Sequence, residues 1–219
     1  MEELVLKQDL PHINCHTDAT RIKLYKSYYI YPIIYTRLLN GETLHSDANS
    51  EIKDKYYKFL LKKNKSDESP CNQIVCGMGA AGHFTSLGVE SLPFFNPLKS
   101  LITDNNNVAN TYHTSNNDTK TWDPVAKQLW NAINLIILKC HKYYYGGPLF
   151  AIRYKLLQKP AQEPSSGLIK SINTIMDRLD KGKTLTQYVN ECKINDPNFQ
   201  DFKFDLLVKK LDIDTRSHF

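Results

Sequence analysis

The stretch QIVCGMGAAGH, at 73–83, is the first part of the chain whose residue types and spacing could support chemistry. Gly77-x-Gly79-x-x-Gly82 has the spacing of a dinucleotide-binding turn, where glycines admit a pyrophosphate to a helix N-terminus. Such a turn belongs to a βαβ unit with an acidic residue about twenty positions further on, but residues 96–101 are NPLKSL. We therefore interpret it as a tight packing turn, with a nucleotide-binding enzyme as an alternative.

Cysteine and histidine groups could in principle hold a metal or supply a nucleophile. The candidates are Cys71, Cys76 and His83; His12, Cys15 and His16; and Cys140 with His141. None has the two clusters of pairs, about two to four residues apart, that close a zinc tetrahedron. Adjacent residues point in different directions from a helix, so Cys140 is interpreted as a buried structural cysteine. With no GxSxG, P-loop, HExxH or CxxC sequence present, we expect no catalytic residue, no metal, no cofactor and no enzyme.

The stretch KCHKYYYGGPLFAIRYKLLQK, at 139–159, sets three successive tyrosines beside a glycine pair, with five cations and no acid. Successive side chains of a helix point about 100° apart, so at least one of Tyr143, Tyr144 and Tyr145 should face outward or into a cleft. Gly146-Gly147 would let the backbone turn there and approach a ligand. Phosphates attract Lys and Arg, and unstacked bases stack on aromatic rings, so the stretch suggests contact with single-stranded nucleic acid.

Charge is distributed unevenly along the 219 residues, although the net charge of +5 is mild. Residues 21–66 hold ten Lys/Arg against four Asp/Glu, and residues 124–162 hold six against none. The intervening 67–123 hold two against six, and 163–219 balance at nine each. Eleven of the thirteen tyrosines lie in the two basic blocks. This co-location favours nucleic-acid binding, although a lysine stripe is usually a solvated face and tyrosines often bury their rings.

Apolar periodicity and capping signals predict an all-α fold, or a mainly α fold with a minor sheet, in two helical lobes around a basic groove. Helix is expected from Asp18 to Asn40-Gly41 with a kink at Pro32, and again after an Asn49-Ser50 cap. Residues 71–103 should form short helices around a tight turn.

Later helices should start at Asp123-Pro124 and Pro148, with Gly146-Gly147 between them, and around Leu168. Two more should follow a Thr184/Gln187 capping box and Asp196-Pro197. The predicted parts are an N-terminal arm (1–17), a first lobe (18–103), a polar boundary loop (104–121) and a second lobe (122–219) that ends in an amphipathic helix.

We predict a nucleic-acid interface in which cations contact phosphate and three tyrosines offer stacking surface. Its residues are Lys55, Lys58, Lys62, Lys65, Lys139, Lys142, Tyr143, Tyr144, Tyr145, Arg153, Lys155 and Lys159. The first four recur at intervals of three and four, which would place them on one helical face. The expected ligand is single-stranded nucleic acid, specifically RNA, bound without sequence preference. The general plan is similar to that of a small viral nucleocapsid protein, an analogy of fold from which no residue roles are carried over.

Apolar residues near both ends suggest self-association through 1–17 and 197–213, with packing on the chain's own core as the simpler alternative. Five scattered cysteines and a polar, acidic start predict reduced thiols and a cytoplasmic protein, with the nucleus also open. The longest apolar run, INLIIL at 133–138, is too short to span a membrane. A non-enzymatic interaction module, whose basic face meets an acidic protein, is the main alternative to nucleic-acid binding.

Overall fold

A computed structural model of the chain describes residues 13–39, 42–63, 72–99, 121–139, 147–179 and 182–219. It divides the chain into two compact units, Met1–Pro93 and Phe94–Phe219. The predicted boundary loop, 104–121, lies almost entirely outside the described residues. The described part is mainly helical with a minor sheet, which confirms the coarser form of the fold prediction.

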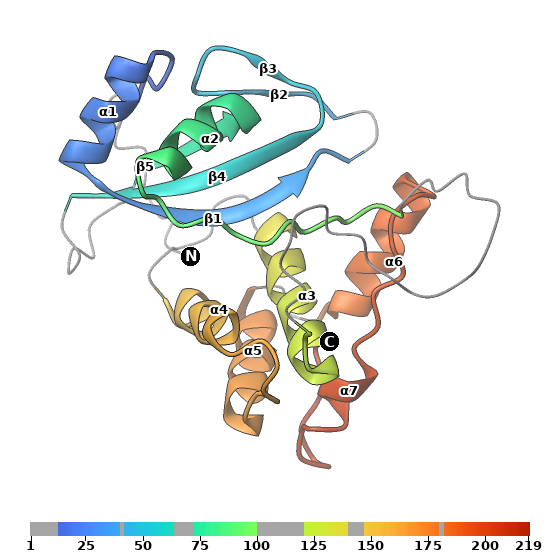
Figure 1. The fold of residues 1–219 in the computed structure, drawn as a ribbon. Coiled ribbons are helices and arrows are strands. Elements are labelled where there is room, and N and C mark those ends of the chain that lie inside the picture. Colours follow the sequence, from blue (N-terminus) through green and yellow to red (C-terminus); the bar gives the residue numbers. More distant parts are fainter. Residues whose placement is uncertain (1–12, 40–41, 64–71, 100–120, 140–146, 180–181) are drawn as a thin grey trace, which may run out of the picture. The chain divides into compact units, whose positions relative to one another are not determined.

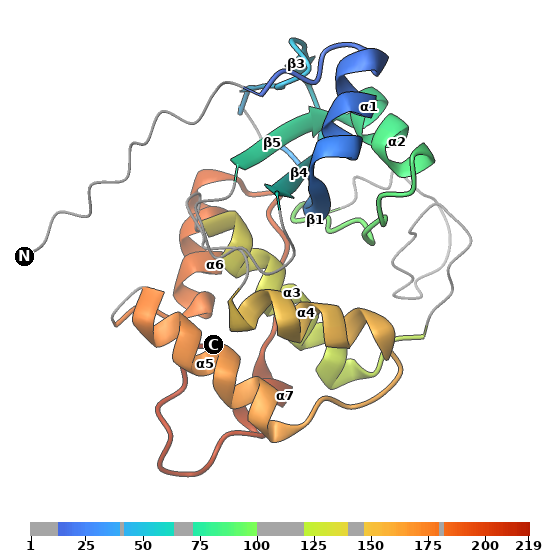
Figure 2. The same cartoon turned by 90° about the vertical axis from the view of Figure 1, so that its left-hand side faces the viewer.

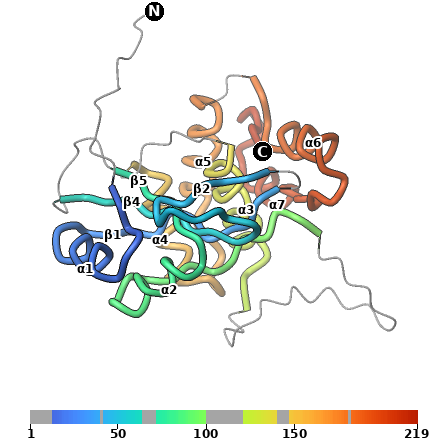
Figure 3. The backbone as a smooth tube through the Cα atoms, turned by 90° about the horizontal axis from the view of Figure 1, so that it is seen from above, coloured from blue at the N-terminus to red at the C-terminus, as the bar shows by residue number. Residues whose placement is uncertain are grey.

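The first unit is built on a three-stranded antiparallel sheet (Figure 1). Its strands are β1 (Tyr29–Arg37), β4 (Lys55–Lys62) and β5 (Asn72–Gly77), with β4 in the centre. Helix α2 (Met78–Ser86) packs against β4 and β5, and α1 (Asp18–Ser27) packs against α2. Seen from above, α1 runs directly into β1 (Figure 3). A short ladder of β2 (Leu44–His45) and β3 (Glu51–Ile52) completes the unit.

The sheet corrects the prediction of helix for residues 29–37. The stretch YIYPIIYTR is rich in aromatic and β-branched side chains, which suit a pleated strand better than a helix. Pro32 does not kink a helix but lies in edge strand β1, beside a register shift between Pro32 and Ile34. A proline is tolerated there because an edge strand or a bulge does not need every backbone N–H.

The helix predicted after Asn49-Ser50 is also wrong, because residues 55–62 form the central strand. Five of its eight residues are buried, including Tyr56 and Tyr57, which are neighbours in the sequence. A strand covered on both faces has a nearly continuous apolar run, and such a run lacks the alternation that identifies a half-buried strand. Asn49 does not cap a helix; it occupies the left-handed region (φ 58°) in the turn between β2 and β3.

The second unit is a helical bundle around α3 (Pro124–Lys139), which contacts all four other helices of the unit. These are α4 (Pro148–Gln158), α5 (Ser166–Leu179), α6 (Leu185–Asn195) and α7 (Asp205–Val208). Figure 2 shows α4 and α5 beside α3. Ten residues of α3 are buried, from Val125 to Ile137, so the prediction of a central buried helix is confirmed.

Local start signals in this unit were predicted correctly, with one exception. The Asp123 carboxylate accepts hydrogen bonds from the backbone N–H groups of Val125 and Ala126, at 2.9 and 3.0 Å. The Thr184/Gln187 capping box is present. Asp196-Pro197 opens no helix: the Asp196 carboxylate accepts from the backbone N–H of Asn198 in a local turn, and the last helix begins at Asp205. The fold of 197–213 buries Phe199 and Leu207, while Val208 and Ile213 stay exposed.

Candidate functional site

The predicted lysine stripe does not exist as a single face, because its described members lie on strand β4. Side chains of a strand alternate between faces, so Lys55 lies on the opposite face from Lys58 and Lys62. Burial lowers the pKa of Lys58, and its ammonium group is 5.9 Å from the centre of the Tyr56 ring. Lys58 is therefore held partly inside the unit, and Lys65 lies outside the described residues.

The predicted cations of the second unit fall into two groups. Arg153 is 4% exposed and its guanidinium lies 5.3 Å from the centre of the Phe150 ring, so this arrangement does not offer it to a phosphate. Lys139 is half-buried, with its ammonium 5.1 Å from the centre of the Tyr188 ring. Lys155 and Lys159 are exposed. The remaining predicted residues of this block, Lys142, Tyr143, Tyr144 and Tyr145, lie outside the described residues.

Helix α1 presents an exposed basic and aromatic face, which we call the α1 surface and define as Lys23, Tyr25 and Lys26. Of its helical residues only Leu24 is buried, and the Tyr25 side chain is 41% exposed. These three positions lie within about half a turn of one another around the helix axis, away from Leu24. The α1 surface thus combines two ammonium groups and one accessible ring.

Helix α4 presents a similar face, the α4 surface, defined as Tyr154, Lys155 and Lys159. Tyr154 is 49% exposed and precedes Lys155, while Lys159 follows the last residue of the helix. Leu149, Ile152, Arg153 and Leu156 point inward. Within the described part of the chain, the lysines of both surfaces form no ion pair. Each surface could therefore offer its positive charges to an anion.

Four residues of these surfaces, Lys23, Tyr25, Lys26 and Tyr154, are not among the predicted site residues. One signal in the sequence could have found the first group, because residues 19–41 contain four cations and no acid. At helical spacing, Lys23, Tyr25 and Lys26 fall on the side of the helix opposite Leu24. Tyr154 lies in the acid-free block at 124–162, but which residues of that block face outward depends on the packing of α4.

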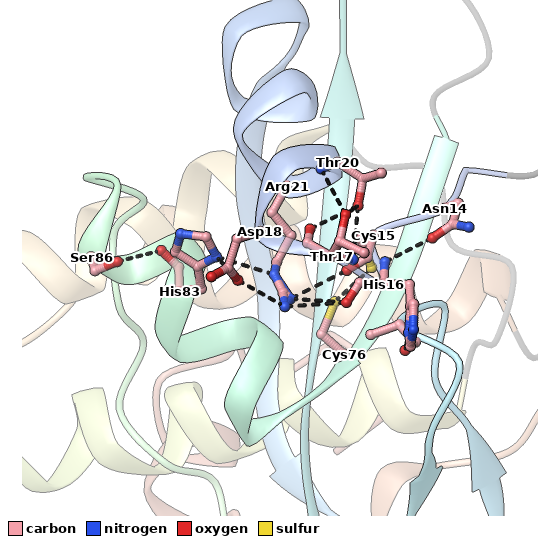
Figure 4. Close-up of polar contacts among 11 residues, drawn as sticks. Asn14, Cys15, His16, Thr17, Asp18, Thr20, Arg21, Cys76, His83 and Ser86 are labelled. Carbon is pink, nitrogen blue, oxygen red and sulfur yellow. Dashed lines mark hydrogen bonds and ion pairs between the residues drawn. The ribbon is translucent and has the colours of Figure 1, made fainter.

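A polar cluster attaches the start of α1 to α2 and so fixes how the α1 surface is presented (Figure 4). Arg21 lies 3.1 Å from an Asp18 oxygen, and its Nε donates to Nδ1 of His83 on α2, at 3.2 Å. The same Nδ1 is 2.9 Å from Asp18 Oδ1. One nitrogen cannot accept from Arg21 and donate to Asp18 at the same time, so the tautomer of His83 selects one of these two contacts.

Further contacts hold the Arg21 side chain and the start of α1 in place. The Arg21 side chain is only 12% exposed, and its terminal nitrogens donate to the carbonyl oxygens of Cys15 and His16, at 3.3–3.5 Å. Thr17 and Thr20 form a capping box at the start of the helix. Near its other end, a Cβ added at Gly88 (φ +103°) would lie 3.0 Å from the Tyr25 hydroxyl. A larger residue at position 88 would be strained by the positive φ and would press against the Tyr25 hydroxyl.

The described residues add no support for a nucleotide site at the glycine turn or for a metal site at the cysteine and histidine groups. Gly77 ends β5 and Gly79 and Gly82 lie in α2, but β5 pairs antiparallel with β4, unlike the strands of a dinucleotide-binding βαβ unit. Among the residues that the structure describes, no three His, Cys, Asp or Glu side chains are grouped to hold a metal ion. His12, Cys71, Cys140 and His141 are not among these residues. In the described residues, no helix combines the length and apolar character that crossing a bilayer requires.

Residues 13–214 match the family described as "Uncharacterised conserved protein UCP028583", and the chain belongs to this family. No curated protein matches the chain. No solved structure matches it either.

Proposed function

We propose that the chain binds single-stranded nucleic acid, specifically RNA, without sequence preference, through the α1 and α4 surfaces. The observation that carries the proposal is that each unit exposes a helix face on which an accessible tyrosine lies beside two lysines, in an acid-free stretch of sequence. Lysines supply the salt-dependent attraction to phosphate, and exposed rings supply stacking that every base can use.

The placement of the two tyrosines supports nucleic acid over a generic anion. A free phosphate or a sulfate needs only cations, whereas a nucleic-acid base can also stack on an accessible ring. Stacking on a ring is worth about 1–3 kcal/mol per base. The proposal keeps a nucleocapsid-like plan of binding: a strand long enough to contact both surfaces gains affinity, because linked contacts reinforce each other.

Charge reversal combined with a salt series tests the proposal. The variants are Lys23→Glu/Lys26→Glu and Lys155→Glu/Lys159→Glu, and the measurement is fluorescence anisotropy with labelled oligouridine. Each pair should weaken binding at least about tenfold, roughly 1.4 kcal/mol. The slope of log affinity against log salt should fall by about 0.7 for each phosphate that the variant no longer neutralises.

The matched control is Lys53→Glu/Lys203→Glu, which makes the same charge change at two exposed lysines, one in each unit. It should weaken binding much less than either test variant. Equal weakening by test and control would show an effect of net charge alone and would reject the two surfaces. If neither salt nor charge reversal changes the affinity for oligouridine, the proposed nucleic-acid binding is rejected.

An interaction module for an acidic protein remains the second candidate, because lysines alone would serve it. Tyr25→Ala and Tyr154→Ala separate the two functions. Removal of the stacking ring should weaken oligouridine binding, while Tyr→Phe at the same positions retains the ring and most of the affinity.

A further inference from the structure

A buried pair of thiols lies next to the polar cluster of α1, independent of the two basic surfaces. The sulfurs of Cys15 and Cys76 are 3.7 Å apart, although the residues are 61 positions apart in the sequence. Both side chains are 0% exposed, and both are thiols rather than a disulfide. Hydrogen bonds of the surrounding backbone hold the two sulfurs close together.

Asp47 holds the two cysteine segments together. The backbone N–H of Cys15 donates to the Asp47 carbonyl at 3.2 Å. Asp47 also exchanges two hydrogen bonds with Val75, the neighbour of Cys76: its N–H donates to the Val75 carbonyl at 2.9 Å, and its carboxylate accepts from the Val75 N–H at 2.6 Å. Arg21 adds a contact to the Cys15 carbonyl at 3.5 Å. The fold therefore fixes the two thiols in position.

We propose that Cys15 and Cys76 form a peroxide-sensitive dithiol, which a small hydroperoxide converts reversibly into a disulfide that joins the segment before α1 to β5. The geometry favours bridge formation over further oxidation of one sulfur, because the second thiol already lies in contact with the first.

The two sulfurs differ in electrostatic environment, which assigns their roles. The hydrogen bond from Cys76 lowers the pKa of the Cys15 thiol, and Arg21 lowers it further, against burial and the charge of Asp47. The same hydrogen bond, followed by burial, raises the pKa of the Cys76 thiol. The lower pKa of the Cys15 thiol favours it as the sulfur that attacks the oxidant, because the thiolate is the nucleophile.

The reaction balances with the hydroperoxide as oxidant. The Cys15 thiolate attacks one peroxide oxygen, the O–O bond breaks, and a sulfenic acid forms while the departing oxygen takes up a proton and leaves as water. Cys76 then loses its proton and attacks the Cys15 sulfur, the S–O bond breaks, and a second water leaves as the S–S bond forms. Two thiols are oxidised by two electrons, and one hydrogen peroxide is reduced to two waters.

The test treats the folded full-length protein with hydrogen peroxide and maps the bridges by mass spectrometry of its peptides. We expect the Cys15–Cys76 bridge to dominate over every other pairing of the five cysteines, and dithiothreitol to remove it. The thermal midpoint of the first unit should rise by at least about 5 °C, because the bridge closes a long loop. A sample unfolded in urea before treatment should lose this selectivity.

Cysteine-to-serine variants give a second test of the bridge. With Cys71, Cys140 and Cys192 replaced by Ser, the folded chain should lose two hydrogen atoms in mass on oxidation. Adding Cys15→Ser to that background should abolish the loss. The proposal is overturned if Cys15–Cys76 is no more frequent in the folded than in the unfolded wild type, or if Cys15 proceeds to sulfinic acid instead. Mapping of the wild type needs no substitution, so it decides the question even if a variant does not fold.

Discussion

At the scale of single residues, the tyrosines of the first unit differ in exposure, from buried to exposed, in a way that the sequence does not reveal. Tyr56 and Tyr57 are each 6% exposed, and Tyr57 is stacked between Tyr35 and Phe59, with ring centres 4.4 and 5.2 Å away. Tyr25 instead keeps its ring accessible. Only an accessible ring can stack on a base, so Tyr56 and Tyr57, two of the seven tyrosines in the first basic block, contribute to core packing instead.

The buried tyrosines should make the protein sensitive to alkaline pH. Burial raises the pKa of Tyr56 to about 12, against 10.0 for an ordinary tyrosine. The neutral form is favoured in the folded state, so stability is complete below pH 10 and falls as the pH rises toward 12, by about 1.4 kcal/mol per unit. Tyr56→Phe should remove that part of the loss, measured by denaturant unfolding at several pH values.

Tyr25→Phe is the matched control, because this ring is exposed, and its alkaline loss should equal that of the wild type. Burial lowers the pKa of Lys58, so its contribution to the pH dependence of stability has the opposite sign. Lys58 is present in the wild type and in both variants, so this contribution cancels in the comparison. Equal alkaline losses in Tyr56→Phe and wild type would contradict the assignment.

At the scale of elements, some helices carry a start signal within their own first turn. In α6, the Gln187 N–H donates to the Thr184 hydroxyl at 3.1 Å, and the Thr184 N–H donates to the Gln187 side chain at 2.8 Å. These bonds satisfy backbone donors that the first turn of a helix leaves unpaired. The capping box thus acts locally.

Thr184→Ala should therefore destabilise the second unit by about 1 kcal/mol, because it removes the hydroxyl that accepts a hydrogen bond from the Gln187 backbone N–H. Urea unfolding followed by tryptophan fluorescence measures this change. Thr186→Ala, at an exposed position inside the same helix, should be neutral or slightly stabilising, since alanine is the better helix former. Equal effects at both positions would show that the capping box contributes nothing.

At the scale of the whole molecule, the chain consists of two units that each have their own core. Phe59, Ile74 and Phe84 are buried in the first unit, and Leu129, Ile133 and Ile172 in the second. Both tryptophans of the chain, Trp122 and Trp130, belong to the second unit. Fluorescence therefore reports on the second unit, while circular dichroism reports on both.

Phe59→Ala should destabilise the first unit by about 3–5 kcal/mol, because it leaves a cavity between β4 and α2. Part of the circular dichroism signal should then be lost at a lower denaturant concentration than in the wild type. The midpoint of the fluorescence transition should stay unchanged. Leu129→Ala, in α3, should move the fluorescence midpoint instead. If Phe59→Ala shifts both signals equally, the two units unfold as one.

Across these scales, the sequence by itself determined what depends on near neighbours. It identified the capping of α3 and α6, the start of α4 after the glycine pair, the buried character of α3 and the two basic blocks. Capping boxes and amphipathic periodicity depend on residues about three or four positions apart, so one short segment of sequence contains the full signal.

Only the tertiary structure decided which stretches become strands and which cations reach the surface. β1, β4 and β5 obtain their hydrogen bonds from one another across long separations, and β4 is covered on both faces, so no local period identifies it. Arg153 and Lys155 are two positions apart in the same helix, yet one is buried and the other exposed. That difference follows from the direction in which α4 packs, and packing is a property of the assembled unit.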